Sequence, residues 1–553
     1  MVTSPAPDLV LLNGKVTVPA DKGGRPRESE AIAIRSGRVL TVGANDDLAA
    51  LAGQATTVVD VEGRRVVPGL IDSHVHFVRA GLTWNDETRW ERIHDLEEGL
   101  GLIREAAQAR PLGTWIRVIG GWHPNQLAER RGPTLEELDR VAPGHPVVIQ
   151  NQYEWGMLNT LAMKAVGLTS EVADAVGPMS FDRDGDGRPL GIVRGMASLR
   201  WLYAQLPVPS LEEQVSSTAA LSRELARFGI TGVIDGGGIN SGPDIYHAVY
   251  EARRRNQLRT RVRLMIHASG PGVEREEYES YLRYVHPLVG DPLLQVIGLG
   301  EIVLYAIHDS ESRPPSLTRE AREDLHWICA RFAAARWPVQ IHTCRPETVE
   351  AVLDCWEAVD REHPIGALRW GLVHAECLEP STIERLRRLG AGALIPSLFR
   401  FEGDSMLEAW GEERMRTAPP LRAILNAGVP LGGGTDALRV APYLPFTALR
   451  WYTDGLSVSG QRTRDDANLL SREEALRAYT AAGAWFSFEE QTRGSLEPGR
   501  LADLAVLSGD YFSVPPEELA NLESELTLLG GEPVWSAPTF SGLATQVAGG
   551  PGH

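Results

Sequence analysis

The sequence predicts an α/β fold, a (β/α)8 barrel of the TIM type with a small β-sandwich formed by both termini and an insertion after the first barrel strand. Three observations predict it. Short strand-like runs separated by Asn-Gly, Ser-Gly and Glu-Gly turns fill the N-terminal region, and the same texture returns near the C-terminus. Between these ends, apolar strand-like runs alternate with helical stretches. One stretch early in the alternation is too long and too irregular for a single βα unit.

These patterns divide the chain into three parts. We expect the first part of the β-sandwich in residues 1–66, the barrel in residues 67–485, and the second part of the sandwich with a C-terminal tail in residues 486–553. The insertion spans about 84–200. An open, doubly wound sheet is the alternative, but it needs a glycine-rich phosphate loop, for which "GGGIN" at 236–240 is only a weak candidate.

The alternating elements can be read in order along the chain. Helices are expected at 211–229 and at 471–486, and the second begins with Ser471 and has Glu474 three residues later, which is a capping-box pattern. The strand candidates are 147–151, 231–235, 261–267, 295–305, 338–343, 370–376, 391–397 and 429–436.

Composition limits the classes of function. A net charge of −18 argues against a nucleic-acid partner or an anionic membrane surface, because both need basic patches. The apolar runs are much shorter than the roughly 18 residues of a membrane span, and no basic leader precedes an apolar stretch, so we expect a cytoplasmic protein. The cysteines form no CxxC pair and are expected as reduced thiols.

The segment "VVPGLIDSHVHF" (66–77) predicts the first half of a metal site. It is an apolar run that ends in His74 and His76. Residues i and i+2 of a strand point to the same side, so the two imidazoles can share one ion. A lone His-x-His also arises by chance, and further ligands are needed to support the interpretation.

Three later runs supply such ligands. His342, His374 and Asp436 each end an apolar strand-like run and precede a loop and a helix. The carboxyl ends of barrel strands converge on one face, so these residues are expected to meet His74 and His76 around a metal. Taken singly, each is also compatible with an ordinary hydrogen-bonded histidine or a helix-capping aspartate.

The chain resembles the amidohydrolase superfamily, and within it the amidohydrolase 3 group of enzymes similar to N-substituted formamide deformylase. After "VVPGLIDSHVHF", the motifs that carry the resemblance follow in order: "GWHPNQLAERRGPTLEELD", "FGITGVIDGGG", "IHTCRPETVEAVLDCWE", "VHAECL", "GGTDAL" and "GSLEPGRLADLAVL". The resemblance implies a metal-dependent hydrolase that cleaves a non-peptide C–N bond, amide-type and N-acyl or N-aryl, with metal-activated water. It also implies that Asp436 is a ligand and the general acid/base, and that His374 ligates or activates water.

One departure from the family bears on the number of ions. Relatives with two ions need a bridging anion, usually a carboxylated lysine or a glutamate, and Val303 falls at the lysine position. We therefore expect one divalent ion, with zinc favoured and Mn²⁺ or Fe²⁺ also suitable. Glu154, ranked first, and Glu301 and His308, ranked lower, are the candidate replacements. Cys344 is interpreted as a packed thiol rather than a ligand.

The insertion and the last loop suggest a small-molecule substrate of aromatic or apolar character. Candidate substrate-binding residues are Trp122, His123, Glu154, Trp155 and Arg439. Aromatic stacking would suit an aryl group, and the arginine could pair with a carboxylate. Ordinary packing explains the same residues equally well.

Three functions remain open at the level of sequence. Amide hydrolysis leads, a deaminase or a hydrolase of cyclic amides or C–C bonds within the same superfamily is the alternative, and a non-catalytic binding barrel is the third. Retention of all five ligand positions argues against the third. A homo-oligomer is an expectation from the family alone.

Overall fold

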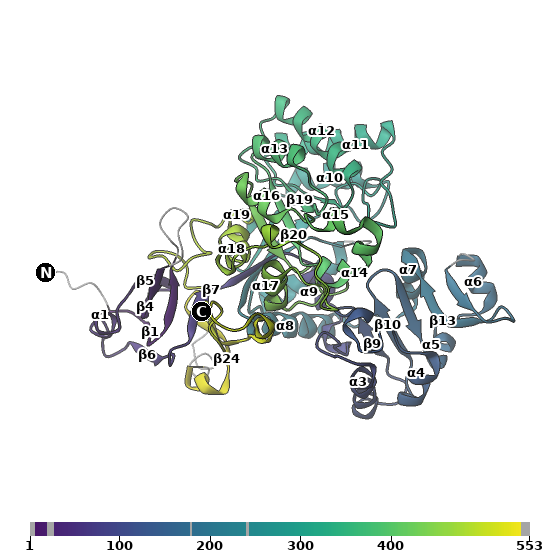
Figure 1. The fold of residues 1–553 in the computed structure, drawn as a ribbon, viewed down its shortest axis with the longest axis horizontal. Coiled ribbons are helices and arrows are strands. Elements are labelled where there is room, and N and C mark those ends of the chain that lie inside the picture. Colours follow the sequence, from purple (N-terminus) through teal and green to yellow (C-terminus); the bar gives the residue numbers. More distant parts are fainter. Residues whose placement is uncertain (1–5, 19–26, 177–179, 239–242, 544–553) are drawn as a thin grey trace.

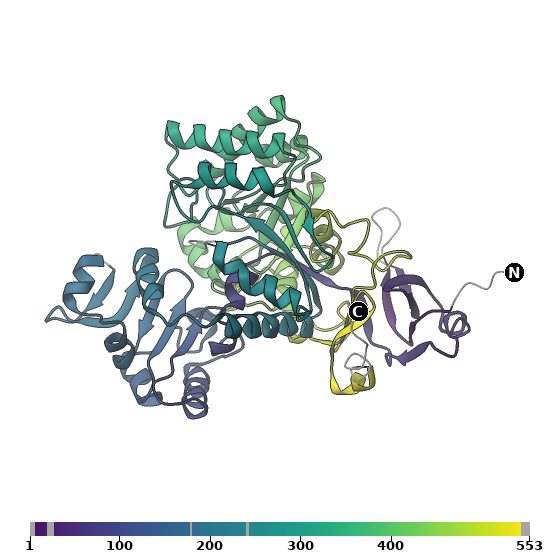
Figure 2. The same cartoon turned by 180° about the vertical axis from the view of Figure 1, so that it is seen from behind.

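The computed structural model describes residues 6–18, 27–176, 180–238 and 243–543, and these form a mixed α/β fold. The sheets built by the termini lie on one side of a large central region, and residues 84–200 lie on the other side (Figures 1 and 2). The predicted C-terminal tail falls in residues 544–553, outside the described part of the chain. None of the helices in the described segments is long and apolar enough to cross a membrane.

Both termini contribute to the sheets on the first side. One sheet has the order β5-β4-β1-β6, and the other has the order β24-β23-β22-β7-β2-β3. In the second sheet β7 pairs antiparallel with β22, so residues near the start of the chain bond to residues near its end. The strands are β1 (Leu9–Leu12), β2 (Lys15–Val18), β3 (Arg27–Ser29), β4 (Ala31–Arg35), β5 (Arg38–Gly43), β6 (Thr57–Asp60), β7 (Arg65–Pro68), β22 (Leu504–Leu507), β23 (Ser524–Leu529) and β24 (Glu532–Ser536).

The central region contains two sheets, with the orders β16-β17-β15-β14-β8 and β18-β19-β20-β21. Apart from the short β16, neighbouring strands pair in parallel. Their residues are almost all buried, as expected for parallel strands covered on both faces. The strands are β8 (Leu70–Val75), β14 (Ile230–Asp235), β15 (Arg261–Ile266), β16 (Val289–Gly290), β17 (Leu294–Leu299), β18 (Gln340–Thr343), β19 (Gly371–His374), β20 (Gly392–Pro396) and β21 (Leu431–Gly434).

Backbone hydrogen bonds join the two central sheets at both of their edges. At one edge the amide of Leu299 donates to the carbonyl of Pro338 at 2.9 Å. At the other edge the amide of Asp436 donates to the carbonyl of His74, and the amide of His76 donates to the carbonyl of Ala437, both at 2.9 Å. The carboxyl ends of strands from both sheets therefore meet at one place.

Helices flank the central strands, and their sequence signals explain where they begin. The predicted capping box is present, because Ser471 Oγ accepts from the Glu474 amide at 3.2 Å and Glu474 Oε2 accepts from the Ser471 amide at 2.8 Å. The single helix predicted at 471–486 is instead two, α18 (Arg472–Ala478) and α19 (Ala481–Phe486). The break follows from tertiary bonding, since the Tyr479 carbonyl accepts from the Ile71 amide of β8 at 2.6 Å.

The insertion has its own sheet, with the order β12-β13-β11-β10-β9. The strand predicted at 147–151 is β10 and belongs to this sheet rather than to the central region. Gln152 Nε2 donates to the carbonyl of Val440 at 3.2 Å, and this bond ties the insertion to the loop after β21. The strands are β9 (Ile116–Ile119), β10 (Val147–Asn151), β11 (Trp155–Leu158), β12 (Phe181–Arg183) and β13 (Pro189–Arg194).

Candidate metal centre

The five predicted ligands come together at the carboxyl ends of the central strands. His74 lies in β8, and His76 follows the strand directly. His342 lies in β18, His374 ends β19, and Asp436 follows β21 by two residues. All five side chains are buried. The strand-end pattern read from the sequence therefore corresponds to a real cluster.

The first group in the cluster is His74, His76 and Asp436. Asp436 Oδ1 lies 3.0 Å from His76 Nε2 and 3.5 Å from His74 Nε2. His76 Nδ1 lies 2.6 Å from the carbonyl oxygen of Gly237. A proton on Nδ1 donated to that carbonyl leaves Nε2 with a free lone pair directed at Asp436, which is the arrangement that metal-binding histidines adopt.

Glu301 lies at the middle of the cluster. Its Oε2 is 3.0 Å from His342 Nδ1, 3.4 Å from His74 Nε2 and 3.7 Å from His374 Nε2, and its Oε1 is 3.5 Å from His76 Nε2. The sequence ranked Glu301 below Glu154. Glu301 follows β17 by two residues, so the strand-end rule that identified the histidines would have identified it as well.

Val303, which the sequence placed at the bridging position, packs its side chain in the main hydrophobic core, where it is 1% exposed. Only its backbone amide contacts the cluster, by donating to the carbonyl of Glu301 at 3.0 Å. The prediction of a single ion rested on a valine occupying the bridging position. A carboxylate stands in the middle of the cluster instead, and this removes that reason.

The second group is His342 and His374, each with a further partner. His374 Nδ1 lies 3.4 Å from Glu376 Oε1, and His342 Nε2 lies 2.9 Å from the carbonyl oxygen of Asp309. These contacts leave His374 Nε2 and His342 Nδ1 directed at Glu301. Buried Glu376 was not singled out in the sequence.

Cys344 and His308 stand beside this second group. Cys344 Sγ is 3.3 Å from His342 Nε2, and burial raises the pKa of the thiol well above its usual value, so it is a neutral thiol here. The His308 ring is centred 4.2 Å from the His342 ring. Burial, together with the neighbouring His342, lowers the pKa of His308 well below its usual value, so its imidazole is neutral.

Charges within the cluster compensate one another. Burial opposes ionisation of Glu301, but His74 and His342 outweigh it and hold the pKa of this carboxyl well below its usual range. Burial likewise disfavours a proton on His374, but hydrogen bonding to Glu301 and Glu376 raises its pKa well above the usual value. Buried carboxylates and imidazoles are thus paired, and a cation between them would satisfy both kinds of group.

Two of the predicted ligands have an unusual backbone. His374 has φ 68° and Asp436 has φ 60°, in the left-handed region that non-glycine residues rarely adopt. Such conformations cost free energy and concentrate at functional sites, where the surrounding structure maintains them. The bonds between the two sheets maintain Asp436 here.

The donor set fits divalent cations. Nε2 of His74 faces Glu301 and Asp436, is buried and lacks a hydrogen-bond partner, which is costly unless a cation accepts its lone pair. Among the described residues, the ligand atoms of His74, His76 and Asp436 lie within 4.8 Å of one another, as do those of His74, Glu301 and His374. Imidazole and carboxylate ligands suit zinc, manganese and iron(II).

A cavity of about 510 Å³ opens over the cluster, between the insertion and the central region. Tyr153 and Glu154 line it from the insertion, and Phe399, Glu402 and Trp410 line it from α14 (Phe399–Trp410). Burial raises the pKa of Glu402 to about 8, so its carboxyl is neutral at pH 7. Aromatic and acidic groups of α14 thus form a wall that the sequence did not reveal.

The predicted substrate-binding residues separate into two sets. Glu154 lines the central cavity, and Arg439 lines a second cavity beside it. Trp122, His123 and Trp155 line neither cavity.

Packing and helix capping account for the contacts of Trp122, His123 and Trp155. Trp122 is fully buried, donates to the carbonyl of Gln150 at 2.9 Å and packs against Trp90, with ring centroids 4.9 Å apart. Trp155 packs on Trp122 with ring centroids 5.9 Å apart. His123 Nδ1 accepts from the amide of Asn125 at 3.1 Å and so caps a short 3₁₀ helix.

Comparison with known proteins adds relatives along nearly the whole chain. "Protein LONG AFTER FAR-RED 3" of Arabidopsis thaliana is 26% identical over 522 residues, which cover 91% of this chain and 87% of the relative. An N-substituted formamide deformylase of Arthrobacter pascens is 26% identical over 545 residues, covering 95% and 97%.

Two solved structures share the fold. An uncharacterized metal-dependent hydrolase from Pyrococcus horikoshii has a TM-score of 0.66 at 19% identity and covers 92% of this chain and 99% of its own. Atrazine chlorohydrolase from Arthrobacter aurescens, complexed with zinc, has a TM-score of 0.54 at 16% identity and covers 98% and 99%. The model of the amidohydrolase family matches residues 57–535, and the chain therefore belongs to the amidohydrolase family.

Proposed function

We propose that this protein is a metal-dependent hydrolase that cleaves an amide-type, non-peptide C–N bond of a small molecule. The observation that carries the proposal is the position of Glu301 among four imidazoles, with Asp436 beside them, at the floor of a cavity of about 510 Å³. The similarity to an N-substituted formamide deformylase supports the kind of bond.

The proposed scaffold is a closed (β/α)8 barrel. Its strand order would be β8, β14, β15, β17, β18, β19, β20, β21 and back to β8. The hydrogen bonds at both edges of the two sheets support closure. The proposed parts are a terminal β-sandwich from residues 1–66 and 486–553 and a barrel from residues 67–485, with 84–200 inserted after the first strand.

The proposed ligands hold two ions rather than one. His74, His76 and Asp436 would hold the first ion, His342 and His374 the second, and Glu301 would be shared. Zinc is favoured because it suits this donor set and is bound in the related atrazine chlorohydrolase. When bound, divalent cations supply Lewis acidity and lower the pKa of water toward neutrality.

The residues of the chain would then carry the proton transfers. Asp436 is one of the proposed ligands and also lines the cavity. It would accept a proton from the attacking water and deliver it to the leaving nitrogen. Glu376 would keep the His374 ring oriented. The walls formed by the insertion and α14 would exclude bulk water from the reacting bond.

A metal count combined with a charge-removing variant tests the proposal. We expect about two equivalents of divalent metal per chain in the wild type, and a loss of metal with at least about a hundredfold lower activity in Glu301→Gln, which removes the shared negative charge. Glu320→Gln, on the exposed first turn of α11 (Arg319–Ala334), is the matched control. Activity is measured on paired N-formyl and N-acyl arylamines.

Three outcomes would contradict the proposal. One equivalent of metal in an active wild type would restore the single-ion interpretation. Full activity in Glu301→Gln would remove the shared carboxylate from the mechanism. Release of ammonia from a cyclic amidine, with no cleavage of any amide in the panel, would redirect the assignment to a deaminase.

A further inference from the structure

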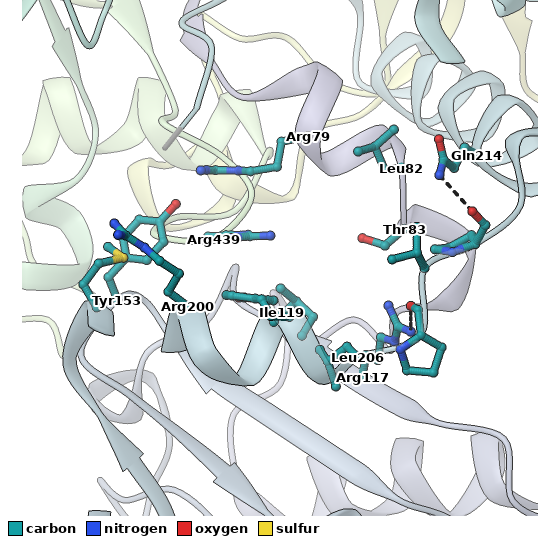
Figure 3. A pocket seen from close by; sticks show the side chains of 16 residues that line it. Arg79, Leu82, Thr83, Arg117, Ile119, Tyr153, Arg200, Leu206, Gln214 and Arg439 are labelled. Carbon is teal, nitrogen blue, oxygen red and sulfur yellow. Dashed lines mark hydrogen bonds between the residues drawn. The ribbon is translucent and has the colours of Figure 1, made fainter. Parts of the chain in front are cut away.

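A second cavity, of about 430 Å³, lies beside the catalytic one and is strongly basic (Figure 3). Arg79, Arg117, Arg200 and Arg439 all line it. They come from three different parts of the chain, namely the helix after β8, the insertion and the loop after β21. In a chain with a net charge of −18, such a concentration of guanidinium groups around one hollow calls for a ligand.

Three of these arginines, Arg79, Arg117 and Arg439, have no direct ion pair among the described residues, although Asp86 and Glu87 lie near enough to Arg117 to act on its charge. Arg439 instead stacks over the ring of Tyr203, 4.3 Å from its centroid, and Arg79 lies 5.7 Å from the centroid of Tyr153.

Two buried polar atoms of lining residues have no hydrogen-bond partner among the described residues. Arg117 donates Nη2 to the carbonyl of Pro207 at 2.7 Å, but its buried Nε has no partner. The buried hydroxyl of Tyr203 also lacks one. Glu87, one of the acids near Arg117, is already occupied, with Arg89 Nη2 2.7 Å from Oε2 and the Thr83 hydroxyl 2.5 Å from Oε1.

The basic cavity adjoins the cavity over the metal cluster. Arg79, Tyr153 and Met196 line both. Two of the arginines are also tied to metal ligands by the chain itself, because Arg79 follows His76 by three residues and Arg439 follows Asp436 by three residues. Arg79 therefore borders both the space over the metal cluster and the space among the arginines.

We propose that the basic cavity binds a carboxylate carried by the substrate, so that the enzyme hydrolyses amides that bear a free carboxylate on an apolar spacer. This inference rests on the proposed function. Guanidinium groups bind carboxylates through paired, charge-assisted hydrogen bonds. Leu82, Ile119 and Leu206 provide apolar wall for the spacer.

A binding experiment tests the cavity independently of catalysis. Calorimetry of the full-length protein with benzoate, 3-phenylpropanoate and hexanoate should show binding of a carboxylate, and the corresponding neutral amides should bind much more weakly. Arg439→Gln should weaken carboxylate binding about tenfold, because each charge-assisted bond contributes that much. Binding should persist after chelation of the metal, which excludes coordination of the carboxylate to an ion.

Two further variants complete the design. Arg200→Gln changes an exposed residue of the same cavity and should also weaken binding, which guards against a folding defect in Arg439→Gln. Arg104→Gln, on the exposed face of α3 (Leu96–Ala109), is the matched control and should bind as the wild type does.

The catalytic arm compares 6-acetamidohexanoate with N-pentylacetamide, which differ only in the carboxylate at the end of the apolar spacer. The wild type should favour the carboxylate through a lower KM, and Arg439→Gln should lose that preference, so that its KM values for the two amides become similar. Equal binding of carboxylates and amides, or an unchanged preference in both cavity variants, would overturn the inference. Carboxylate binding without hydrolysis of any amide would overturn the proposed function and leave the cavity assignment standing.

Discussion

At the scale of single residues, the cluster depends on carboxylates that act on histidines rather than on substrate. Glu376 is buried and lies 3.4 Å from His374 Nδ1. A carboxylate in this position fixes the tautomer and the ring orientation of the ligand it faces and makes it more basic. We therefore expect a positional role for Glu376, which differs from the role expected of Glu301, since Glu301 faces four imidazole nitrogens.

Glu376→Gln should lower metal affinity or kcat by about 10- to 100-fold, because the amide orients His374 without its charge. Metal titration and steady-state kinetics measure the effect. KM for a neutral amide should change little, since Glu376 acts through His374. If Glu376→Gln kept the wild-type metal affinity and the wild-type kcat, the contact between Glu376 and His374 would not contribute to metal binding or catalysis.

Glu402 predicts a pH dependence of stability. Burial, together with Glu154 and Glu376, raises the pKa of this carboxyl to about 8, against a value of 4.5 for an ordinary glutamate. The folded protein therefore holds a proton that the unfolded chain releases, and stability falls as the pH rises from 4.5 to 8.

Glu402→Gln removes this dependence, because the amide cannot ionise. After chelation of metal, the variant should melt at the wild-type temperature near pH 4.5 and above it at pH 9. The chelation matters since bound cations would lower the pKa of Glu402. If the wild type and Glu402→Gln melted at the same temperature at both pH values, the carboxyl of Glu402 would lie in a more polar environment than its burial indicates.

At the scale of elements, close approach of backbones positions the insertion over the catalytic cavity. Gly120, at the end of β9, has φ +100°, and a Cβ there would lie 2.2 Å from the carbonyl oxygen of Arg439. The loop after β21 can approach the insertion only because this residue has no side chain. The same loop carries Asp436, which lines one cavity, and Arg439, which lines the other, so the close approach at Gly120 affects the position of both residues.

Gly120→Ala should destabilise the protein by more than about 1 kcal/mol, because both the backbone conformation and the clash oppose it. It should also raise KM for amides that carry a carboxylate. Gly101→Ala in α3 is the control, since no atom lies within 4 Å of its Cβ and the change should stabilise the helix by about 0.5–1 kcal/mol. Thermal unfolding distinguishes the two, and a neutral Gly120→Ala would show that the loop can move aside.

At the scale of the whole molecule, buried ion pairs connect the strands to distant parts of the chain. Arg261 of β15 pairs with Asp503 at 2.8 Å, and Arg263 of the same strand pairs with Glu489 at 2.6 Å. Glu489 also pairs with the fully buried Arg493. These groups lie toward the C-terminal part of the chain, so the pairs join the central region to the segment that leads into the terminal sheets.

Acid should weaken this connection. Burial opposes ionisation of Glu489, but Arg493 and Arg263 outweigh it and lower its pKa to about 2, from 4.5. The contribution is therefore complete above pH 4.5 and is lost as the pH falls toward 2. Glu489→Gln should cost about 3–5 kcal/mol at pH 7, because it leaves buried arginines unpaired. Denaturant unfolding should show a smaller difference at pH 3, and a difference independent of pH would contradict the assignment.

The sequence alone determined the features that local patterns carry. His74, His76, His342, His374 and Asp436 each end an apolar run, and the ends of parallel strands converge whatever the loops between them do. The turn-rich ends and the capping box at Ser471 are likewise set by short-range chemistry. Membership of the family followed from motifs in order along the chain.

Only the tertiary structure decided which side chains share a space. Glu301 lies in the cluster and Val303 lies in the core. Both residues follow the end of β17, where the backbone no longer has the regular alternation of a strand, so the sequence does not indicate which way either side chain points. Trp122 and His123 became packing and capping residues, while Arg439 joined arginines from the insertion around one cavity. Such meetings depend on the paths of loops between distant segments, and those paths are set by long-range packing that no local pattern records.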